Sequence, residues 1–264
     1  MIDMNQVALI TGASAGIGYE IALLFAEKNI DVVLVARNEQ KLLTIKQFME
    51  KHYPIKVYSV VSDLSTPEGV NKIRDVVKAK GLTVSYLVNN AGFGVYGNFI
   101  DRSIEKYSEM IALNIESLIT LTHHFAREMV ESGNGRILNV ASTAGFQPDP
   151  YFAIYGATKA FVINFSEALH KELDKTGVTV TVLSPGATRT EFMDRADMGN
   201  TKLFDRGVMT AKRVAQVGFK GMMQGKLHVI PGFKNSVMAF FSSITPSSKW
   251  RLNLTANMMA SKDT

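Results

Sequence analysis

Seven apolar runs rich in β-branched residues recur along the chain and alternate with amphipathic stretches of helical spacing. The runs lie at residues 7–10, 31–36, 56–61, 85–90, 136–141, 178–184 and 227–230. Continuous apolar strands are typical of a sheet that is covered on both faces. Helices are expected between them, near residues 17–28, 39–52, 67–80, 103–132, 152–175 and 210–224. This alternation predicts an α/β fold, a doubly wound, seven-stranded parallel sheet of the Rossmann type.

The length of 264 residues suits one such domain, and no Pro/Gly/Ser-rich linker or repeat marks a second one. We therefore expect a single domain that spans residues 1–264. Two segments interrupt the alternation of strands and helices. Residues 186–209 follow the sixth run, where ligand-covering loops often lie, and are expected to form a substrate loop. Residues 232–264 are expected to form a C-terminal tail.

Composition narrows the classes of function. The chain has no cysteine, which excludes disulfides, zinc ribbons, iron–sulfur clusters and thiol nucleophiles and favours a reducing cytoplasm. The five histidines are scattered, so no metal site is expected. The net charge of +5 comes from basic residues interspersed with acids, which does not favour nucleic-acid binding. We see no signal peptide and no apolar run long enough to span a bilayer.

A glycine-rich turn, Thr-Gly-Ala-Ser-Ala-Gly-Ile-Gly, follows the first apolar run and precedes the first helix. Glycines allow a tight turn and let backbone N–H groups approach a pyrophosphate, which the positive end of a helix also favours. The spacing G-x-x-x-G-x-G differs from the commoner dinucleotide fingerprint, and a plain turn at the start of a helix is the alternative. The residues expected to contact a dinucleotide here are Gly12, Ser14, Ala15, Gly16, Ile17 and Gly18.

The end of the second run bears on the choice of cofactor. An NAD-selective site would place an acidic residue there to bind the adenosine ribose, and Ala36 cannot accept those hydrogen bonds. Arg37 instead offers a planar cation that suits a 2′-phosphate, with a further hydroxyl available from Ser14. The sequence therefore favours NADP(H), and a solvated surface arginine is the alternative.

Polar and small residues follow two further runs, Asp63 and Leu64 after the third and Asn90, Ala91 and Gly92 after the fourth. The carboxyl ends of parallel strands form the edge at which open α/β sheets bind ligands. Asn and Asp are also ordinary turn formers, so it is their combined placement that favours cofactor contacts.

Tyr155 and Lys159 are four residues apart on an expected helix, so their side chains share one face. A phenol loses its proton near pH ~10, and a nearby ammonium favours the phenolate, which brings proton exchange with a carbonyl or alcohol closer to neutral pH. Among the eight tyrosines, Tyr155 alone has a lysine four positions later. Exposed helix neighbours produce the same spacing, so the pair needs other support.

That support comes from TGASAGIG, NNAG, Asn114, Ser142, YGATK and PGATRT, which occur in this order. With these motifs the chain resembles the short-chain dehydrogenase/reductase family from residue 5 to about residue 230. The resemblance implies a catalytic tetrad of Asn114, Ser142, Tyr155 and Lys159, with Lys159 also binding the nicotinamide ribose. It further implies cofactor contacts from Tyr155, Lys159, Pro185, Gly186, Thr188 and Thr190. The tail resembles those of bacterial reductases called DltE-like, which are uncharacterised.

Ser142 and Asn114 can also be interpreted from their chemistry and position alone. The Ser142 hydroxyl at the end of the fifth run is suited to hydrogen-bond a substrate oxygen, and a turn serine is the alternative. Asn114 is a mediocre helix former within a helical stretch, consistent with a local kink and a water relay toward Lys159. Simple polarity on a helix surface is its alternative.

The expected function is hydride transfer between NADPH and a ketone or aldehyde, with Tyr155 as the acid that protonates the oxygen. An apolar substrate pocket is expected from aromatic and apolar residues near the predicted site, although these residues suit core packing equally well. They are Phe93, Val95, Tyr96, Phe146, Tyr151, Phe152 and Phe192.

Alternatives concern the tail and the class of protein. The bulky apolar residues of the tail favour packing on the domain or assembly into a homodimer or homotetramer, and peripheral membrane contact is the alternative. An epimerase or dehydratase of the extended fold would have a different glycine spacing and a larger C-terminal domain. A dinucleotide sensor or scaffold would often have lost the Tyr/Lys pair, which this chain retains.

Overall fold

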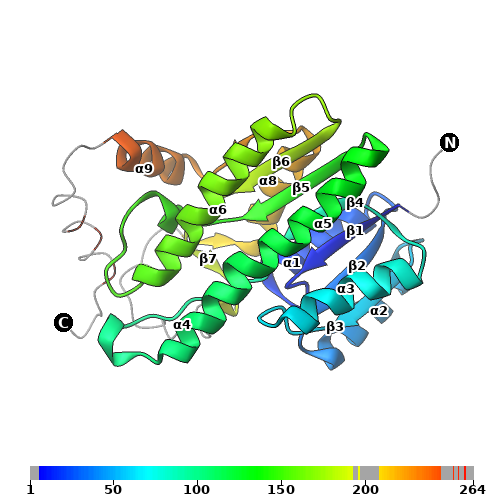
Figure 1. The fold of residues 1–264 in the computed structure, drawn as a ribbon, viewed down its shortest axis with the longest axis horizontal. Helices are drawn as coiled ribbons and strands as arrows, with labels where there is room; N and C mark the ends of the chain where they lie inside the picture. Colours follow the sequence, from blue (N-terminus) through cyan, green and yellow to red (C-terminus); the bar gives the residue numbers. More distant parts are fainter. Residues whose placement is uncertain are drawn as a thin grey trace.

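The computed structural model describes residues 6–192, 196, 208–244, 252, 255 and 259. Its central sheet has seven parallel strands in the order β3-β2-β1-β4-β5-β6-β9, which confirms the fold predicted from the sequence (Figure 1). The strands are β1 (Gln6–Thr11), β2 (Asp31–Ala36), β3 (Val57–Val61), β4 (Thr83–Asn89), β5 (Gly135–Val140), β6 (Val178–Leu183) and β9 (His228–Val229). Strands β4, β5 and β6 end level with one another, because Asn89 pairs with Asn139 and Val140 pairs with Leu183.

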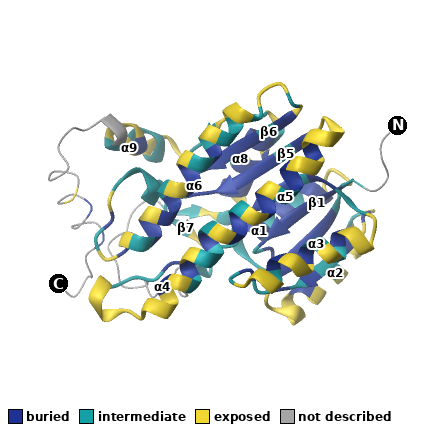
Figure 2. Cartoon of the chain, viewed as in Figure 1, coloured by how far each residue is buried: buried dark blue, intermediate teal, exposed yellow. Residues whose placement is uncertain are grey.

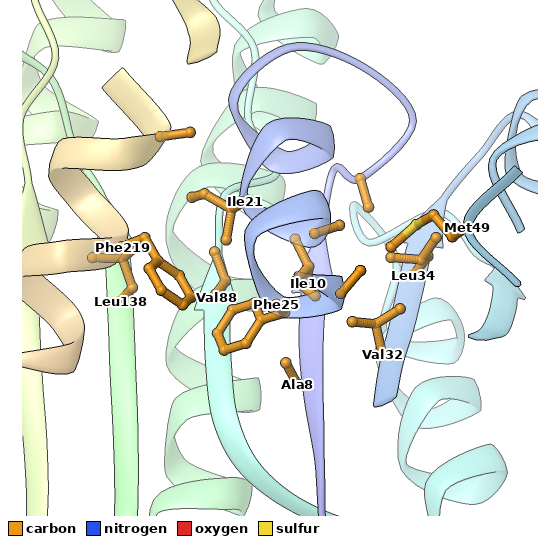
Figure 3. Close-up of a cluster of buried hydrophobic side chains, with 14 of the residues drawn as sticks. Ala8, Ile10, Ile21, Phe25, Val32, Leu34, Met49, Val88, Leu138 and Phe219 are labelled. Carbon is orange, nitrogen blue, oxygen red and sulfur yellow. The ribbon is translucent and has the colours of Figure 1, made fainter. Parts of the chain in front are cut away.

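Helices cover both faces of the sheet, as the continuous apolar strands require. One face packs against α1 (Gly16–Ala26), α2 (Glu39–His52) and α8 (Ala211–Met223), and the other against α3 (Pro67–Ala79), α5 (Ser117–Ser132) and α6 (Ala153–Glu172). The inner sides of the helices and the strands are buried (Figure 2). Phe25 of α1 stands edge-on to Phe219 of α8 on one face of the sheet, with ring centroids 4.9 Å apart (Figure 3).

The helix expected over residues 103–132 is interrupted. It consists of α4 (Ile104–Ile111), a π-helical turn η2 (Ala112–Glu116) and α5. Asn114 lies in this turn, and its amide nitrogen donates to the Phe93 carbonyl at 3.0 Å and to Thr158 Oγ1 at 3.1 Å, while its oxygen accepts from the Phe93 N–H. The local irregularity expected at Asn114 is therefore a π-bulge, which turns a polar side chain into the interior.

Several elements were not expected from the sequence. They are helix α9 (Phe233–Ile244), the short parallel pair β7 (Thr188–Arg189) and β8 (Met209–Thr210), and the 3₁₀ turns η1 (Phe99–Asp101) and η3 (Thr143–Phe146). Most of the expected substrate loop and of the tail beyond α9 lies outside the described residues. Among the described helices, none is long and apolar enough to cross a membrane.

The edge strand β9 is held by a hydrogen-bonded trio. His228 Nε2 lies 2.8 Å from Ser184 Oγ at the end of β6, and its Nδ1 lies 2.8 Å from Glu167 Oε1 on α6. Ser184 is fully buried, so no substrate can reach its hydroxyl as it would in a hydrolase. The trio fastens β9, and hence the start of the segment that leads into α9.

A buried chain of amides and hydroxyls fixes the middle of the sheet against the helices. Asn89 Nδ2 donates to Asn139 Oδ1 at 2.8 Å and to Thr122 Oγ1 of α5 at 2.9 Å. Asn139 Nδ2 donates in turn to Ser166 Oγ of α6 at 2.8 Å. All four side chains are nearly inaccessible to water. Each of these hydrogen bonds therefore replaces one that its donor and acceptor would otherwise form with water.

We expect Asn139→Ala to lower the free energy of unfolding by about 2–4 kcal/mol, because it deprives Asn89 Nδ2 and Ser166 Oγ of buried partners and leaves a cavity. Urea denaturation followed by circular dichroism measures this loss. The control, Asn71→Ala on the exposed side of α3, should change stability by less than ~0.5 kcal/mol. Equal losses in the two variants would contradict a structural role for the buried chain.

Candidate active site

A cavity of about 580 Å³ lies at the carboxyl edge of the sheet. Most of the site residues expected from the sequence line it, namely Gly12, Ser14, Ala15, Gly16, Ile17, Arg37, Asp63, Leu64, Asn90, Ala91, Gly92, Ser142, Tyr155, Lys159, Pro185, Gly186, Thr188 and Thr190. Gly18 and Asn114 do not line the cavity. Open α/β folds bind ligands at the carboxyl ends of their strands, in the crevice where the strand order reverses.

The glycine-rich turn at the end of β1 is tightly constrained. Gly12 and Gly16 have φ angles of 64° and 59°, which favour glycine. A Cβ atom at Gly18 would lie 2.5 Å from the Gly12 carbonyl oxygen and 2.5 Å from Asn90 Nδ2. Gly18 therefore serves close packing of α1 against the turn, whereas the sequence suggested that it contacts the cofactor.

The start of α1 fits a phosphate group. Its N-cap residue, Ala15, makes no side-chain hydrogen bond to the first turn, whereas Asn38 caps α2 and Thr66 caps α3 through their side chains. The first N–H groups of α1 thus have no capping side chain, and Ala15, Gly16 and neighbouring residues line the cavity. Uncapped N–H groups at a helix N-terminus are well suited to a pyrophosphate.

Thr11, which the sequence analysis did not single out, joins the ends of β1 and β4. Its hydroxyl donates to the Val88 carbonyl and accepts from the N–H groups of Asn90 and Ala91, both at 2.9 Å. The Asn90 amide returns two bonds, to the carbonyl oxygens of Thr11 and Gly12 at 2.9 and 3.2 Å. The side chain of Asn90 thus shapes the cavity by holding the glycine turn.

At the far end of the cavity, Arg37 is paired with two acids. Its Nη1 lies 3.5 Å from Glu109 Oε1 and 3.8 Å from Asp63 Oδ2, and 56% of its side chain is exposed. Burial alone would raise the pKa of Asp63, but hydrogen bonds from Ser65 and the charge of Arg37 hold it below its ordinary value. Arg37 therefore presents an accessible guanidinium at the cavity, held by carboxylates of other elements.

Tyr155 and Lys159 lie buried on α6. Lys159 Nζ donates to the Val140 carbonyl at 3.0 Å and lies 5.6 Å from the centroid of the Tyr155 ring. Burial lowers the pKa of Lys159 to about 8. Burial also raises the pKa of Tyr155 above its ordinary value, opposed by a hydrogen bond with Ser142 and reinforced by the charge of Asp149.

From the sequence, Lys159 is expected to lower the pKa of Tyr155. In the structure the ammonium is bonded to a backbone carbonyl, and burial of the phenol outweighs the other contributions, so the pKa of Tyr155 lies above its ordinary value. The phenol is consequently protonated at neutral pH. Such a group can donate a proton to an oxygen that becomes negative.

Ser142 lies at the surface of the cavity, whereas Asn114 lies behind it in the protein interior. The Ser142 hydroxyl accepts from the Ala144 N–H at 3.2 Å and lines the cavity beside Tyr155. Asn114 lies beneath the surface and has no direct hydrogen bond to Lys159 among the bonds of the described residues. Gly92 separates the two, since a Cβ there would lie 2.9 Å from Asn114 Oδ1 and 3.5 Å from Lys159 Nζ.

The aromatic residues expected around a substrate divide into two groups. Phe93, Phe152 and Phe192 line the cavity, and the Phe152 ring stacks on Tyr155 with centroids 4.3 Å apart. Val95, Tyr96, Phe146 and Tyr151 do not line the cavity. Val95 and Tyr96 instead pack around the cluster that contains Tyr155, and Phe146 stacks on His228.

The substrate end of the cavity also contains residues that the sequence analysis missed. They are Gln147 and Asp149 before α6, Asn235, Met238, Ala239 and Ser242 of α9, and Thr255 and Met259. Asp149 is only 5% exposed, and burial raises its pKa to about 7 although Gln147 Nε2 donates to its Oδ1 at 3.2 Å. The sequence Gln-Pro-Asp-Pro resembles an ordinary surface turn, which concealed these positions.

Comparison with known proteins agrees with this geometry. Residues 6–200 match the profile of the short chain dehydrogenase family. An uncharacterised oxidoreductase of Staphylococcus epidermidis is 34% identical over 198 residues, which cover 75% of this chain and 84% of the relative.

Solved structures are similar over nearly the whole chain. A short-chain dehydrogenase from Sphingobium yanoikuyae in complex with NADPH has 31% identity and a TM-score of 0.81, covering 92% of this chain and 98% of that one. The bulky-bulky ketone specific alcohol dehydrogenase from Comamonas testosteroni has 26% identity and a TM-score of 0.77, covering 93% and 96%. Other matched structures hold NADH or NAD, so these proteins do not share one cofactor.

The raised pKa of Asp149 predicts a pH-dependent cost to stability. Its carboxyl ionises near pH 3.8 in the unfolded chain and near 7 in the folded protein, so stability falls as pH rises through that window. We expect Asp149→Asn to remove this fall. Its unfolding free energy relative to the parent protein should increase by on the order of 2 kcal/mol between pH 5 and pH 8.

Urea denaturation at several pH values measures this difference. The control is Asp174→Asn, whose exposed carboxyl has its pKa lowered below 3.8 by Lys171. Asp174 is therefore ionised in both the folded and the unfolded state above pH 5, and the difference between this variant and the parent protein should stay constant between pH 5 and pH 8. A difference between Asp149→Asn and the parent protein that stays constant with pH would show that Asp149 is not a buried acid.

Proposed function

The chain belongs to the short-chain dehydrogenase family and is an oxidoreductase, and we propose that it uses NADP(H) to interconvert a carbonyl and an alcohol on a small molecule. The observation that carries this proposal is the meeting of Ser142, Tyr155 and Lys159 in the same cavity as the uncapped glycine turn. One cavity thus contains a proton donor and a phosphate cradle. A bound nicotinamide would supply the hydride.

Proton transfer is assigned to Tyr155. Its phenol is protonated at neutral pH, as an ordinary phenol with a pKa of 10.0 also is, and it donates its proton to the carbonyl oxygen during reduction. Ser142, which is hydrogen-bonded to Tyr155, polarises the same oxygen. Lys159, fixed by the Val140 carbonyl, stabilises the phenolate that remains and binds the hydroxyls of the nicotinamide ribose.

NADP(H) is favoured over NAD(H) by the end of β2. Ala36 has no side-chain acceptor for the ribose hydroxyls, and Arg37 lines the cavity with an accessible guanidinium. A 2′-phosphate would form a charge-assisted, bidentate pair with Arg37. The similar dehydrogenase from Sphingobium yanoikuyae, described with NADPH, supports this choice.

The remaining expectations stay proposals. We propose one domain over residues 1–264, with residues 186–209 as its substrate loop, and a cytoplasmic location, supported by the absence of cysteine. A homodimer or homotetramer is supported by exposed apolar side chains around the start of α4, at Phe99, Ile100 and Ile104.

We expect Tyr155→Phe to abolish NADPH-dependent reduction of ketones and aldehydes while NADPH still binds, because the variant lacks only the transferable proton. Activity is followed by NADPH oxidation across a panel of ketones and aldehydes, and binding by the fluorescence of NADPH. Tyr58→Phe on β3, which does not line the cavity, is the control and should retain activity. Retained turnover in Tyr155→Phe would rule out the assignment.

We expect Arg37→Ala to weaken NADPH binding by about 10- to 100-fold and NADH binding by much less, since only NADPH has the 2′-phosphate. Dissociation constants of both cofactors, measured by fluorescence titration, test this. The control is Arg127→Ala, an exposed arginine on α5 outside the cavity. An unchanged ratio of the two constants in Arg37→Ala would show that the preference is set elsewhere.

A further inference from the structure

Asp149 is an acidic side chain at the substrate end of the cavity. It belongs to the loop between η3 and α6, and it lines the cavity although its residue is only 5% exposed. Its Oδ1 accepts from Gln147 Nε2, and among the described residues no group donates a hydrogen bond to its Oδ2. A buried carboxyl with so few partners is costly unless a ligand provides another donor.

The fold does not require a carboxyl at this position. The turn before α6 is closed by the backbone, where the Phe152 N–H donates to the Asp149 carbonyl at 3.1 Å. The N-cap of α6 is Phe152, with no side-chain capping bond. Any residue with the same backbone conformation would form this turn, so the side chain of Asp149 has no structural partner but Gln147 among the described residues.

Gln147 holds Asp149 in a fixed orientation. The nitrogen of its carboxamide donates to Asp149 Oδ1, and its oxygen accepts from Ser242 Oγ of α9 at 3.1 Å. Both ends of this carboxamide are therefore engaged within the protein. A substrate group that reaches this corner finds the second carboxyl oxygen of Asp149 as an acceptor.

The cations of the cavity lie elsewhere. Lys159 is bonded to the Val140 carbonyl, and Arg37 is paired with Glu109 and Asp63 at the opposite, cofactor end. Neither forms an ion pair with Asp149 in the part of the chain that the structure describes. The apolar residues that line the same end of the cavity include Phe152, Met238 and Met259.

From this arrangement we propose that Asp149, oriented by Gln147, binds a hydrogen-bond donor of the substrate, a hydroxyl or an ammonium group, other than the reacting carbonyl. The inference rests on the proposed function and specifies its substrate class. The substrate is a ketone or aldehyde with an apolar body and a second polar group that donates a hydrogen bond. This adds one polar contact to the apolar pocket expected from the sequence.

The test uses the full chain with NADPH and a series of methyl ketones of increasing length, whose far end is a methyl, a hydroxyl or an ammonium group. We expect the parent protein, at its best length, to prefer a donor-ended ketone over the methyl-ended one by about tenfold or more in kcat/KM. The hydroxyl and ammonium series distinguish the two kinds of donor.

Two variants test Asp149 itself. Asp149→Leu should reverse the preference in favour of methyl-ended ketones. Asp149→Asn should lose any preference for ammonium, because it cannot form an ion pair, and keeps the assay informative if the leucine variant does not fold. Asp174→Leu, at an exposed position outside the cavity, is the matched control and should leave the ratios unchanged.

A binding measurement separates this inference from the proposed function. The increase in melting temperature caused by the same compounds is recorded without turnover. Stronger stabilisation by donor-ended compounds, lost in Asp149→Leu, supports the inference even if no ketone is reduced, in which case only the proposed function fails. Reduction without a donor preference, or a preference unaltered in both Asp149 variants, overturns the inference.

Discussion

The candidate active site depends on the hydroxyl of Thr11, which links the ends of β1 and β4 by hydrogen bonds. Strand order reverses where β1 lies between β2 and β4, and open sheets bind ligands at that crevice. Thr11 joins the two strand ends, and Asn90 bonds back to the glycine turn. Because a Cβ at Gly12 would lie 2.8 Å from Asn90 Nδ2, this packing also requires glycine there. The same contacts that close the fold thus leave the N-terminus of α1 facing a preformed cavity.

Burial, more than any single charge pair, sets the acidity of Lys159, Asp149 and Tyr155 in the cavity. It lowers the pKa of Lys159 to about 8, raises that of Asp149 to about 7, and raises that of Tyr155. Each shift reflects the cost of placing a charged form away from water. Functional sites tolerate such costs, and the surrounding sheet and helices supply the stability that offsets them. In contrast, the buried amides of Asn89 and Asn139 hydrogen-bond one another and help to hold the strand ends in place.

The sequence predicts the features that depend on local pattern. Apolar runs located every strand of the central sheet, and the glycine spacing located the turn before α1, because periodicity and backbone freedom are properties of neighbouring residues. It could not predict Asp149, whose burial comes from packing among distant parts of the chain, including α9 and Thr255, which donates to the Pro148 carbonyl. For similar reasons it placed Gly18 among the cofactor contacts, although a contact remote in sequence, Asn90 Nδ2, packs against Gly18 outside the cavity lining.

Asp149 also connects substrate binding with proton transfer. Its negative charge contributes to the raised pKa of Tyr155, whose ring stacks on Phe152 in the same wall. A cationic group that pairs with Asp149 offsets that charge and so removes part of the increase in the pKa of Tyr155. The phenol then becomes a stronger acid when the cationic group of the substrate is in place. Recognition of this group by Asp149 thereby favours proton donation by Tyr155, which a wholly apolar pocket could not achieve.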